Sequence, residues 1–586
     1  MKAAGTIEPR SDRPWTASRL LNAETRRYPG AVLVGMVWAL AFPLPGWAGL
    51  AWVVPGALLL IPAGLPGAST FRVGWVAGVV HHLMALRWLL SMPHAVGAVA
   101  GWLALSGYCA VYAGAWTWFA RRVVLAMLGP GEAAIQPGAT AGWLEWMRRL
   151  AQRSWLQRTI AWATLAAGWV TLEMIRARMF SGFAWNLLGG SQWRQVPLIQ
   201  LASVTGVYGL SFLICWMSLA LTGAWLIMGF RPGNCWGWTA EIRLPLLAVL
   251  LLAGWGFWTA LELRHLRDTA PRSLQLALVQ PSVPQTLQWD SAADAASFER
   301  ILGLSEQALA LKPEILVWPE GSFGLAQETW GRMTNRVISA QASWIFNTIG
   351  QDSHGRPVNS AMWLDADGRI SGQYDKRRLV IFGEYIPLER WLPFMRWLTP
   401  IGSSFAAGGD PVSFVLRLNP TDPPVKVAPI ICFEDTFPHG VREHVQSDTD
   451  FLLEITNDAW FGEGSAQWQH AANAAFRAVE NGVPMVRAAN NGLTQWFDAA
   501  GIIHELFGEN GRVYQPGFLM VRLPVGQARP STYYHRQGDV FGWTCVAWTA
   551  WTLVATHRSR AGKALEISWP GLGRKPGTPG ARPPAG

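Results

Sequence analysis

The chain has 586 residues, of which 51% are apolar and only 15% are charged, and it contains 36 tryptophans. This composition excludes an ordinary soluble protein and predicts several membrane spans, because indole rings favour the boundary between lipid and water. The formal net charge of +10 does not indicate nucleic-acid binding. The basic residues gather in short loops between apolar segments, where they set membrane topology.

Apolar runs divide the chain into five parts. Residues 1–30 are polar and basic and lack a signal-peptide pattern, so they predict a retained cytoplasmic tail. We expect a transmembrane domain of seven helices over 31–262, an outer domain over 263–538, a last helix over 539–556 and a basic, disordered tail over 557–586. The eight predicted spans cover 31–46, 48–64, 73–92, 98–120, 159–177, 198–228, 244–262 and 539–556.

Arginine and lysine are distributed unequally between the two sides of these spans. The short loops on the side of residues 263–538 contain only Arg176, Arg178 and Arg194. The opposite side carries many more basic residues, among them Arg26, Arg27, Arg72, Arg121, Arg122, Arg148, Arg149, Arg153, Arg158, Arg231 and Arg243. Positive loops stay in the cytoplasm, so both termini are expected inside and residues 263–538 outside.

The third predicted span carries three ionisable residues, His81, His82 and Arg87. Ionisable groups at membrane depth are candidates for function, here for contact with a lipid headgroup. The alternative is that Arg87, six residues before Pro93, only extends its side chain to the outer-leaflet phosphates.

The outer stretch alternates between strand-like and helical patterns. Helical periodicity covers 294–311 and 467–482, and the strand-like segments are LQLALVQPSV, EILVWPE, SWIFNTI, NSAMWLDADG, VKVAPIICF and FLLEITNDAW. Such alternation predicts sheets covered by helices.

Three residues that can carry chemistry stand beside apolar runs in this stretch. Cys432 follows the strand-like run from Val425 to Ile431, Glu320 ends EILVWPE, and Lys376 precedes LVIF. A carboxylate base, a cation and a thiol are the minimal parts of an acyl-transfer site. A lone cysteine is more often a buried apolar residue. However, Cys432 is the only cysteine in the outer stretch, so it has no disulfide partner there.

The surroundings of these three residues favour the catalytic interpretation. WPEG, YDKRRLVIFGEYIP and ICFED resemble the Glu-Lys-Cys motifs of the nitrilase superfamily, and FGEYIP is typical of its membrane-bound branch, the apolipoprotein N-acyltransferases. The resemblance implies an α/β domain built as a four-layer αββα sandwich on a multi-span helical domain. It implies Glu320 as general base, Lys376 as the amine that stabilises the oxyanion, and Cys432 as nucleophile.

The same resemblance implies a set of supporting residues and no metal or cofactor. Phe433 stands where this branch often has Tyr, and its backbone N–H remains available to an oxyanion hole. The implied supporting or substrate-binding residues are Glu384, Glu434, Phe433, Trp289 near the substrate entrance, and Asn457 and Trp460 of TNDAWFG.

The resemblance further implies a reaction between two lipids at the periplasmic side of the bacterial inner membrane. A phospholipid, phosphatidylethanolamine, donates an acyl chain to Cys432, and the α-amino group of a diacylglyceryl-cysteine lipoprotein accepts it. The run IPLERWLPFMRWLTPIGSSF carries apolar residues in a Pro-rich context and is interpreted as a lid that dips into the bilayer. The other interpretation is a loop buried against the spans.

Two other functions remain open from the sequence. The same three residues could belong to a membrane-tethered amidase or a lipid hydrolase. Eight spans are many more than such an enzyme would need as an anchor. A transporter or scaffold with a binding domain would leave the three residues as coincidence.

Overall fold

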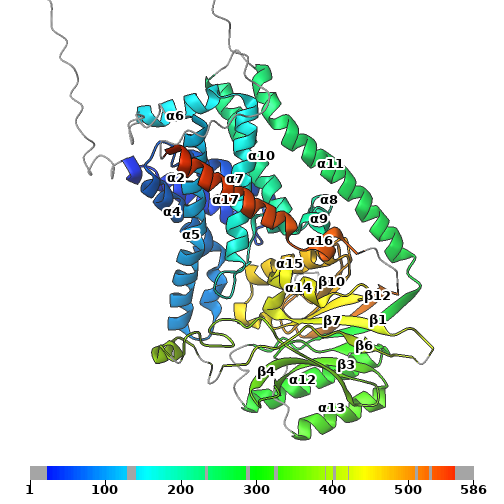
Figure 1. The fold of residues 1–586 in the computed structure, drawn as a ribbon. Helices are drawn as coiled ribbons and strands as arrows, with labels where there is room; N and C mark the ends of the chain where they lie inside the picture. The colour runs from blue at the N-terminus through cyan, green and yellow to red at the C-terminus, as the bar shows by residue number, and fades with distance from the viewer. Residues whose placement is uncertain are drawn as a thin grey trace, which may run out of the picture.

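The computed structural model describes residues 23–128, 140–230, 235–284, 291–321, 327–389, 391–399, 401, 404–419, 421–508, 513–526 and 531–560. It consists of a helical bundle and a sheet-containing domain that lies against one end of the bundle (Figure 1). The two ends of the bundle differ, because the sheet-containing domain is inserted between α11 and the last helix, α17.

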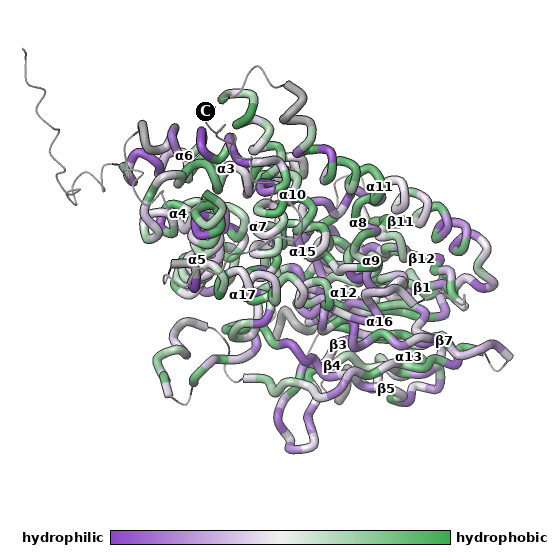
Figure 2. Tube along the Cα trace, turned by 45° about the horizontal axis from the view of Figure 1, so that its top comes forward, coloured by the Kyte–Doolittle hydropathy of each residue, from purple (hydrophilic) through white to green (hydrophobic). Residues whose placement is uncertain are grey.

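The bundle is a multi-span helical membrane domain, as the sequence predicts. Three described helical segments, residues 95–128, 207–230 and 240–268, are long and apolar enough to cross a bilayer. Hydrophobic residues run along much of α10 and α11, and hydrophilic residues collect around α6 (Figure 2). The helices are α2 (Tyr28–Leu40), α3 (Val54–Leu60), α4 (Gly67–Ala85), α5 (Ala95–Leu128), α6 (Thr140–Gln152), α7 (Trp155–Arg176), α10 (Val207–Phe230), α11 (Cys235–Asp268) and α17 (Val540–Arg560).

Two of the predicted spans are interrupted. The segment expected over 48–64 forms a 3₁₀ turn, η1 (Ala48–Trp52), followed by the short α3, which has a proline in its first turn. The segment expected over 198–228 starts with α8 (Val196–Ile199) and α9 (Ala202–Thr205), and α10 begins only after Gly206. Gly206 has a φ of +65°, which ends the preceding helix because an L side chain rarely adopts this conformation.

The ionisable residues of α4 and the turn after it have different surroundings. The His81 ring stacks on Trp38 with centroids 4.1 Å apart, and His82 Nδ1 lies 2.8 Å from the Gly78 carbonyl. Both histidines are fully enclosed by the bundle, whereas Arg87 begins the 3₁₀ turn η2 (Arg87–Ser91) and is exposed. The histidines therefore belong to the packed interior.

The sheet-containing domain holds two six-stranded sheets. The first has the order β12-β1-β2-β3-β4-β5, and the second the order β11-β10-β9-β8-β7-β6. All six predicted strand segments are confirmed as β1, β2, β3, β4, β7 and β8. The strands are β1 (Arg272–Gln280), β2 (Ile315–Val317), β3 (Ser343–Gln351), β4 (Pro357–Leu364), β5 (Ile370–Asp375), β6 (Phe414–Leu416), β7 (Val425–Ile431), β8 (Phe451–Thr456), β9 (Met485–Ala489), β10 (Gln495–Phe497), β11 (Ile503–Leu506) and β12 (Gly517–Val525).

Helices cover the outer face of each sheet and complete the predicted αββα sandwich. Side chains from α12 (Ser291–Leu309) and α13 (Gln327–Ala340) form one core with the first sheet, and a separate core fills the space between the sheets. Strand β7 shows how alternation serves both faces, because Val427 and Ile431 enter the inter-sheet core while Ala428 and Ile430 face the helices on the other side.

The fourth layer, α14 (Pro438–His444) and α15 (Ser465–Asn481), is shared with the membrane bundle. Its apolar residues form one continuous core with those of the bundle helices. Gln469 of α15 ties the two parts together, because its amide group donates to the Pro43 carbonyl at 2.7 Å and accepts from Trp185 Nε1 at 2.7 Å. The sheet-containing domain is thus held on the bundle by apolar packing and buried hydrogen bonds.

A buried group of charges lies between α15 and the second sheet. His470 of α15 contacts Asp435 and Asp458 at 2.9 Å each, and Arg487 of β9 pairs with Asp458 at 2.5 Å and with Glu454. All five side chains are buried. A carboxylate oxygen of Asp435, one of Glu454 and a ring nitrogen of His470 lie within 4.8 Å of one another, a spacing at which such atoms could hold a metal ion. Arg487 already supplies a cation there, so the arrangement functions as a polar core.

The charges in this cluster predict a pH dependence of stability. Burial disfavours the imidazolium of His470, but Asp435 and Asp458 outweigh it and raise its pKa to about 10, whereas burial raises the pKa of Glu454 to about 8. The folded state therefore holds protons that the unfolded state, with a histidine pKa of about 6.5, has released. Stability should be greatest near the lower end of pH 6.5 to 10 and fall by on the order of a few kcal/mol across that range.

Thermal unfolding in detergent, followed by tryptophan fluorescence from pH 6.5 to 10, checks this expectation. His470→Gln should flatten the decrease in Tm, and His354→Gln, a change at an exposed turn, should leave it as in the wild type. A Tm that is constant or rises over this range would contradict the assignment of charge to the cluster.

Candidate active site

A buried lysine lies between two carboxylates at one edge of the sandwich. Lys376 directly follows β5, and its Nζ lies 3.0 Å from Glu320 Oε1 and 2.8 Å from Glu384 Oε1. Its side chain is only 1% exposed. The structure thus brings together three of the residues that the sequence singles out, although Glu320 and Lys376 are 56 residues apart.

An asparagine that the sequence analysis missed holds both carboxylates in place. Asn359 Nδ2 donates to Glu320 and to Glu384 at 2.8 Å each, and its Oδ1 accepts from Asn347 Nδ2 at 2.6 Å. Asn347 in turn accepts from the backbone N–H of Gly321 at 2.9 Å. The sequence signal for these two residues is an asparagine within each of two strand-like runs, Asn347 in SWIFNTI and Asn359 in NSAMWL.

Cys432 stands at the end of β7, where the chain turns into the 3₁₀ helix η7 (Cys432–Thr436). Its φ is +51°, a left-handed conformation that costs a non-glycine residue about 1 kcal/mol or more. The residue is only 6% exposed. The turn directs the thiol into the same buried region as Lys376 and Glu320, whose charges act on it.

Glu434 stabilises this turn and joins it to the lysine-bearing segment. Its carboxylate accepts from the backbone N–H groups of Ile431 and Arg377 at 2.8 Å each, and of Arg378 at 3.1 Å. The Tyr374 hydroxyl donates to it at 2.7 Å. One buried side chain therefore fixes the position of Cys432 relative to Lys376.

The electrostatics keep the lysine charged and the thiol neutral at rest. Burial opposes the charge on Lys376, but Glu320 and Glu384 outweigh it and hold the pKa of the amine well above its ordinary value. Burial, reinforced by Glu320, raises the pKa of the Cys432 thiol despite the nearby lysine. Burial also raises the pKa of Glu384, against the effect of Lys376. A neutral thiol needs a base at the moment of attack.

The other predicted site residues differ in their contacts and in how deeply they are buried. The backbone N–H of Asn457 donates to Glu320 Oε2 at 3.1 Å, and the Asn457 side chain accepts from Asn490 at 2.9 Å. Phe433 is half-buried and packs on Phe437 with ring centroids 5.2 Å apart. Trp460 is half-buried in η8 (Asp458–Phe461). Trp289 lies outside the described residues.

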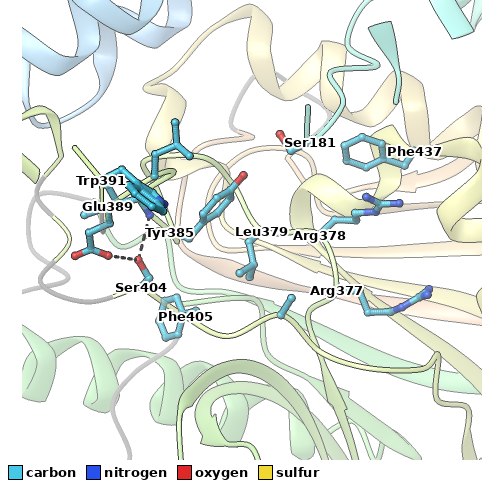
Figure 3. A pocket seen from close by; sticks show the side chains of 13 residues that line it. Ser181, Arg377, Arg378, Leu379, Tyr385, Glu389, Trp391, Ser404, Phe405 and Phe437 are labelled. Atoms are coloured by element: carbon cyan, nitrogen blue, oxygen red, sulfur yellow. Dashed lines mark hydrogen bonds between the residues drawn. The ribbon is translucent and has the colours of Figure 1, made fainter. Parts of the chain in front are cut away.

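A cavity of about 580 Å³ lies beside the segment that carries Lys376 and Glu384, and it is lined by residues next to these two in the chain (Figure 3). Its walls come from the segments that directly follow Lys376 and Glu384, from residues 404–407, from Phe437 after η7, and from Ser181 in the loop after α7. The lining residues are Ser181, Arg377, Arg378, Leu379, Tyr385, Ile386, Leu388, Glu389, Trp391, Ser404, Phe405, Ala407 and Phe437. The walls are largely apolar and join the bundle to the sandwich.

One side of the cavity is formed by the run IPLERWLPFMRWLTPIGSSF, which the sequence analysis interprets as a lid. Trp391 is 81% exposed, and Trp397, in the 3₁₀ turn η6 (Pro393–Leu398), is 79% exposed. The turn η6 lies beside the end of α5 that is nearest the sandwich (Figure 1). Its large apolar side chains therefore face away from the sandwich core.

Two protein-family models match successive parts of this chain. A family model described as the N-terminal domain of apolipoprotein N-acyltransferase matches residues 34–220, and a carbon-nitrogen hydrolase model matches 275–514. An amidase from Nesterenkonia sp. AN1 shares 19% identity and a TM-score of 0.32, over 46% of this chain and 97% of that one.

Curated relatives extend the similarity over nearly the whole chain. The apolipoprotein N-acyltransferase of Geobacter metallireducens is 32% identical over 545 residues, which cover 92% of this chain and 96% of that protein. The apolipoprotein N-acyltransferase of Caulobacter vibrioides is 30% identical over 555 residues, which cover 90% and 92%. This chain therefore belongs to the apolipoprotein N-acyltransferase family.

Proposed function

We propose that this acyltransferase moves an acyl chain from a phospholipid, through a thioester at Cys432, to the α-amino group of a diacylglyceryl-cysteine lipoprotein. The observation that carries the proposal is the buried Lys376, held between Glu320 and Glu384 next to Cys432. The names of the relatives favour a lipoprotein acceptor. Phosphatidylethanolamine is proposed as donor.

The first half-reaction forms the thioester. Glu320 takes the thiol proton as Cys432 Sγ attacks the ester carbonyl, and the charge of Lys376 stabilises the tetrahedral oxyanion. The intermediate collapses when the C–O bond breaks, and the departing lysophospholipid oxygen takes the proton back from Glu320. Glu384 and Asn359 act by positioning Lys376 and Glu320.

The second half-reaction consumes the thioester. The acceptor amine attacks the thioester carbonyl, gives up a proton to Glu320, and forms an amide as the C–S bond breaks. The proton returns to the thiolate, so the enzyme regains its resting state. Phe433 supports the oxyanion through its backbone N–H in this scheme, Trp289 and Trp460 contact the substrates near the entrance, and Asn457 orients Glu320.

We propose that the domain over 263–538 faces the periplasm of a bacterial inner membrane, between the transmembrane domain over 31–262 and the last span over 539–556. The distribution of arginines between the loops supports this orientation. The tails over 1–30 and 557–586 are then cytoplasmic. The exposed Trp391 and Trp397 suit a lid that enters the outer leaflet and admits an acyl chain to the cavity.

The first prediction concerns the thioester and the transfer that follows it. Purified protein given phosphatidylethanolamine and a synthetic diacylglyceryl-cysteine peptide should add one acyl chain to the peptide amine, as measured by mass. Without peptide, the protein itself should gain one acyl chain at Cys432. Cys432→Ser should gain little or none, and Lys376→Met should be slowed by roughly a hundredfold, because the oxyanion loses its cation.

The same measurements separate this proposal from its alternatives. Continuous release of lysophospholipid and fatty acid without peptide would identify a lipid hydrolase, since water would then reach the thioester. Equal labelling of the wild type and Cys432→Ser would contradict the nucleophile. Near-normal turnover of Lys376→Met would contradict the oxyanion role of the lysine.

Membrane orientation gives a second prediction. Alkaline phosphatase is active only in the periplasm, so a fusion after Asp268, at the end of α11, should be active. A fusion after Cys235, at the start of the same helix, should be inactive. The reverse pattern would place Cys432 in the cytosol and refute the proposed topology.

The lid gives a third prediction. Replacing Trp391 and Trp397 together by Gln should slow acylation of Cys432 by vesicle phospholipid by about tenfold, because two bilayer-seeking indoles are lost. Leu311→Gln, a change at a side chain that is 58% exposed in the outer layer, should have no effect. Acylation by a water-soluble p-nitrophenyl ester should be equal in all three proteins. If vesicle phospholipid acylates the double variant at the normal rate, the segment is not an entrance for lipid.

A further inference from the structure

Two consecutive arginines line one side of the cavity. Arg377 and Arg378 both line it, but their side chains differ in what they contact. Arg377 donates to the Gly409 carbonyl at 2.8 Å and pairs with Glu443 at 2.9 Å. In Figure 3 its guanidinium points away from the other lining residues. The guanidinium of Arg377 is thus already paired within the protein.

Arg378 has no such carboxylate partner among the described residues. Its guanidinium lies over the Phe437 ring at 5.4 Å, and the contact with the ring face orients the charge without neutralising it. Ser181 and Tyr385 line the same cavity as Arg378, and Figure 3 shows the side chains of all three among its lining residues. A cation and two hydroxyls together can bind the oxygens of an anion.

Two other arginines lie in the surroundings of Arg378, and one of them has no carboxylate partner among the contacts of the described residues. Arg178, at the end of α7, pairs with Asp539, and the Arg442 guanidinium donates to the His535 carbonyl at 2.8 Å. Burial and the charges of Arg178 and Arg378 lower the pKa of His439 to about 3. The region carries more positive than negative charge, which favours an anionic ligand.

The position of this group in the molecule identifies the kind of anion. Ser181 belongs to the loop directly after α7 of the bundle, and the proposed membrane orientation puts this wall near the headgroups of the outer leaflet. The opposite wall contains Leu388 and Trp391 of the lid, which suit an acyl chain. In a phospholipid, the phosphate is a few bonds from the ester carbonyl, and Arg378 is two residues from Lys376.

We propose that Arg378, with the hydroxyls of Ser181 and Tyr385, binds the phosphate of the donor phospholipid. This assignment rests on the proposed function and adds a restriction to it. The diacylglyceryl-cysteine acceptor reacts through its amine and carries no phosphate. Arg378 therefore acts when phospholipid acylates Cys432 and has no role when the acceptor consumes the thioester.

The two half-reactions test this assignment separately. Acylation of Cys432 should be timed by intact mass with phosphatidylethanolamine and, in parallel, with a p-nitrophenyl fatty-acyl ester, which lacks phosphate. Arg378→Gln should slow the phospholipid reaction by about tenfold or more, the scale of a lost charge-assisted hydrogen bond, and leave the p-nitrophenyl reaction unchanged. Transfer from the acylated variant to the acceptor peptide should proceed at the wild-type rate.

Two further variants control for structural damage. Arg378→Lys keeps the charge but loses the planar fork, so its rate with phospholipid should lie between those of the wild type and Arg378→Gln. Arg369→Gln, at an exposed turn between β4 and β5, should behave as the wild type with both donors.

Three results would overturn the assignment. Equal slowing of Arg378→Gln with both donors would mean that the side chain only supports the cavity wall. An unchanged phospholipid rate would remove any role in donor binding. If inorganic phosphate slows only the wild type while both proteins use phospholipid equally, the site binds free phosphate instead. A wild-type protein that phospholipid does not acylate would contradict the proposed function itself.

Discussion

The structure of the catalytic region depends on the ammonium of Lys376, held between Glu320 and Glu384 in a place closed to water. A buried charge is costly unless it is paired, and removing one partner of such a group typically costs about 3–5 kcal/mol. The two carboxylates keep the buried lysine protonated before a substrate binds. Asn359 donates a hydrogen bond to one oxygen of each carboxylate. In the proposed reaction this cation is in place before any substrate enters, so little reorganisation would be needed when an oxyanion forms.

The rigidity of this site comes from its place in the sandwich. Lys376 follows an edge strand of the first sheet, and Cys432 ends a central strand of the second, so their spacing depends on how the two sheets pack. Glu434 fixes that spacing by accepting backbone hydrogen bonds from both segments. The strained φ of Cys432 is maintained by this network, as is common where a side chain must be aimed at a substrate.

The membrane bundle contributes to the site as well as to anchoring. Layer α14–α15 packs on the bundle on one side and on the second sheet on the other, and the buried charges of His470 and Arg487 lie between this layer and the second sheet. The loop after α7 adds Ser181 to the cavity wall. A substrate with a polar head and apolar chains can therefore contact both parts of the protein at once, which a soluble sandwich alone would not allow.

The sequence by itself determined the elements with strong local patterns. Long apolar runs identify the membrane domain, and a continuous apolar run identifies β7, because burial on both faces leaves few alternatives. Strand β9 was missed because the buried Arg487 interrupts its apolar pattern, and β5 was missed because its burial is uneven. The three motifs also marked Glu320, Lys376 and Cys432 as candidates.

Only the tertiary structure decided how these residues are supported. Asn359, Arg378 and the Asp435–His470 pair depend on contacts between segments far apart in the chain. Sheet register and packing set such contacts, and a single sequence encodes neither in a local periodicity. Local pattern therefore placed the reactive groups on their strands, while packing between distant layers determined which polar side chains surround them and where a substrate can enter.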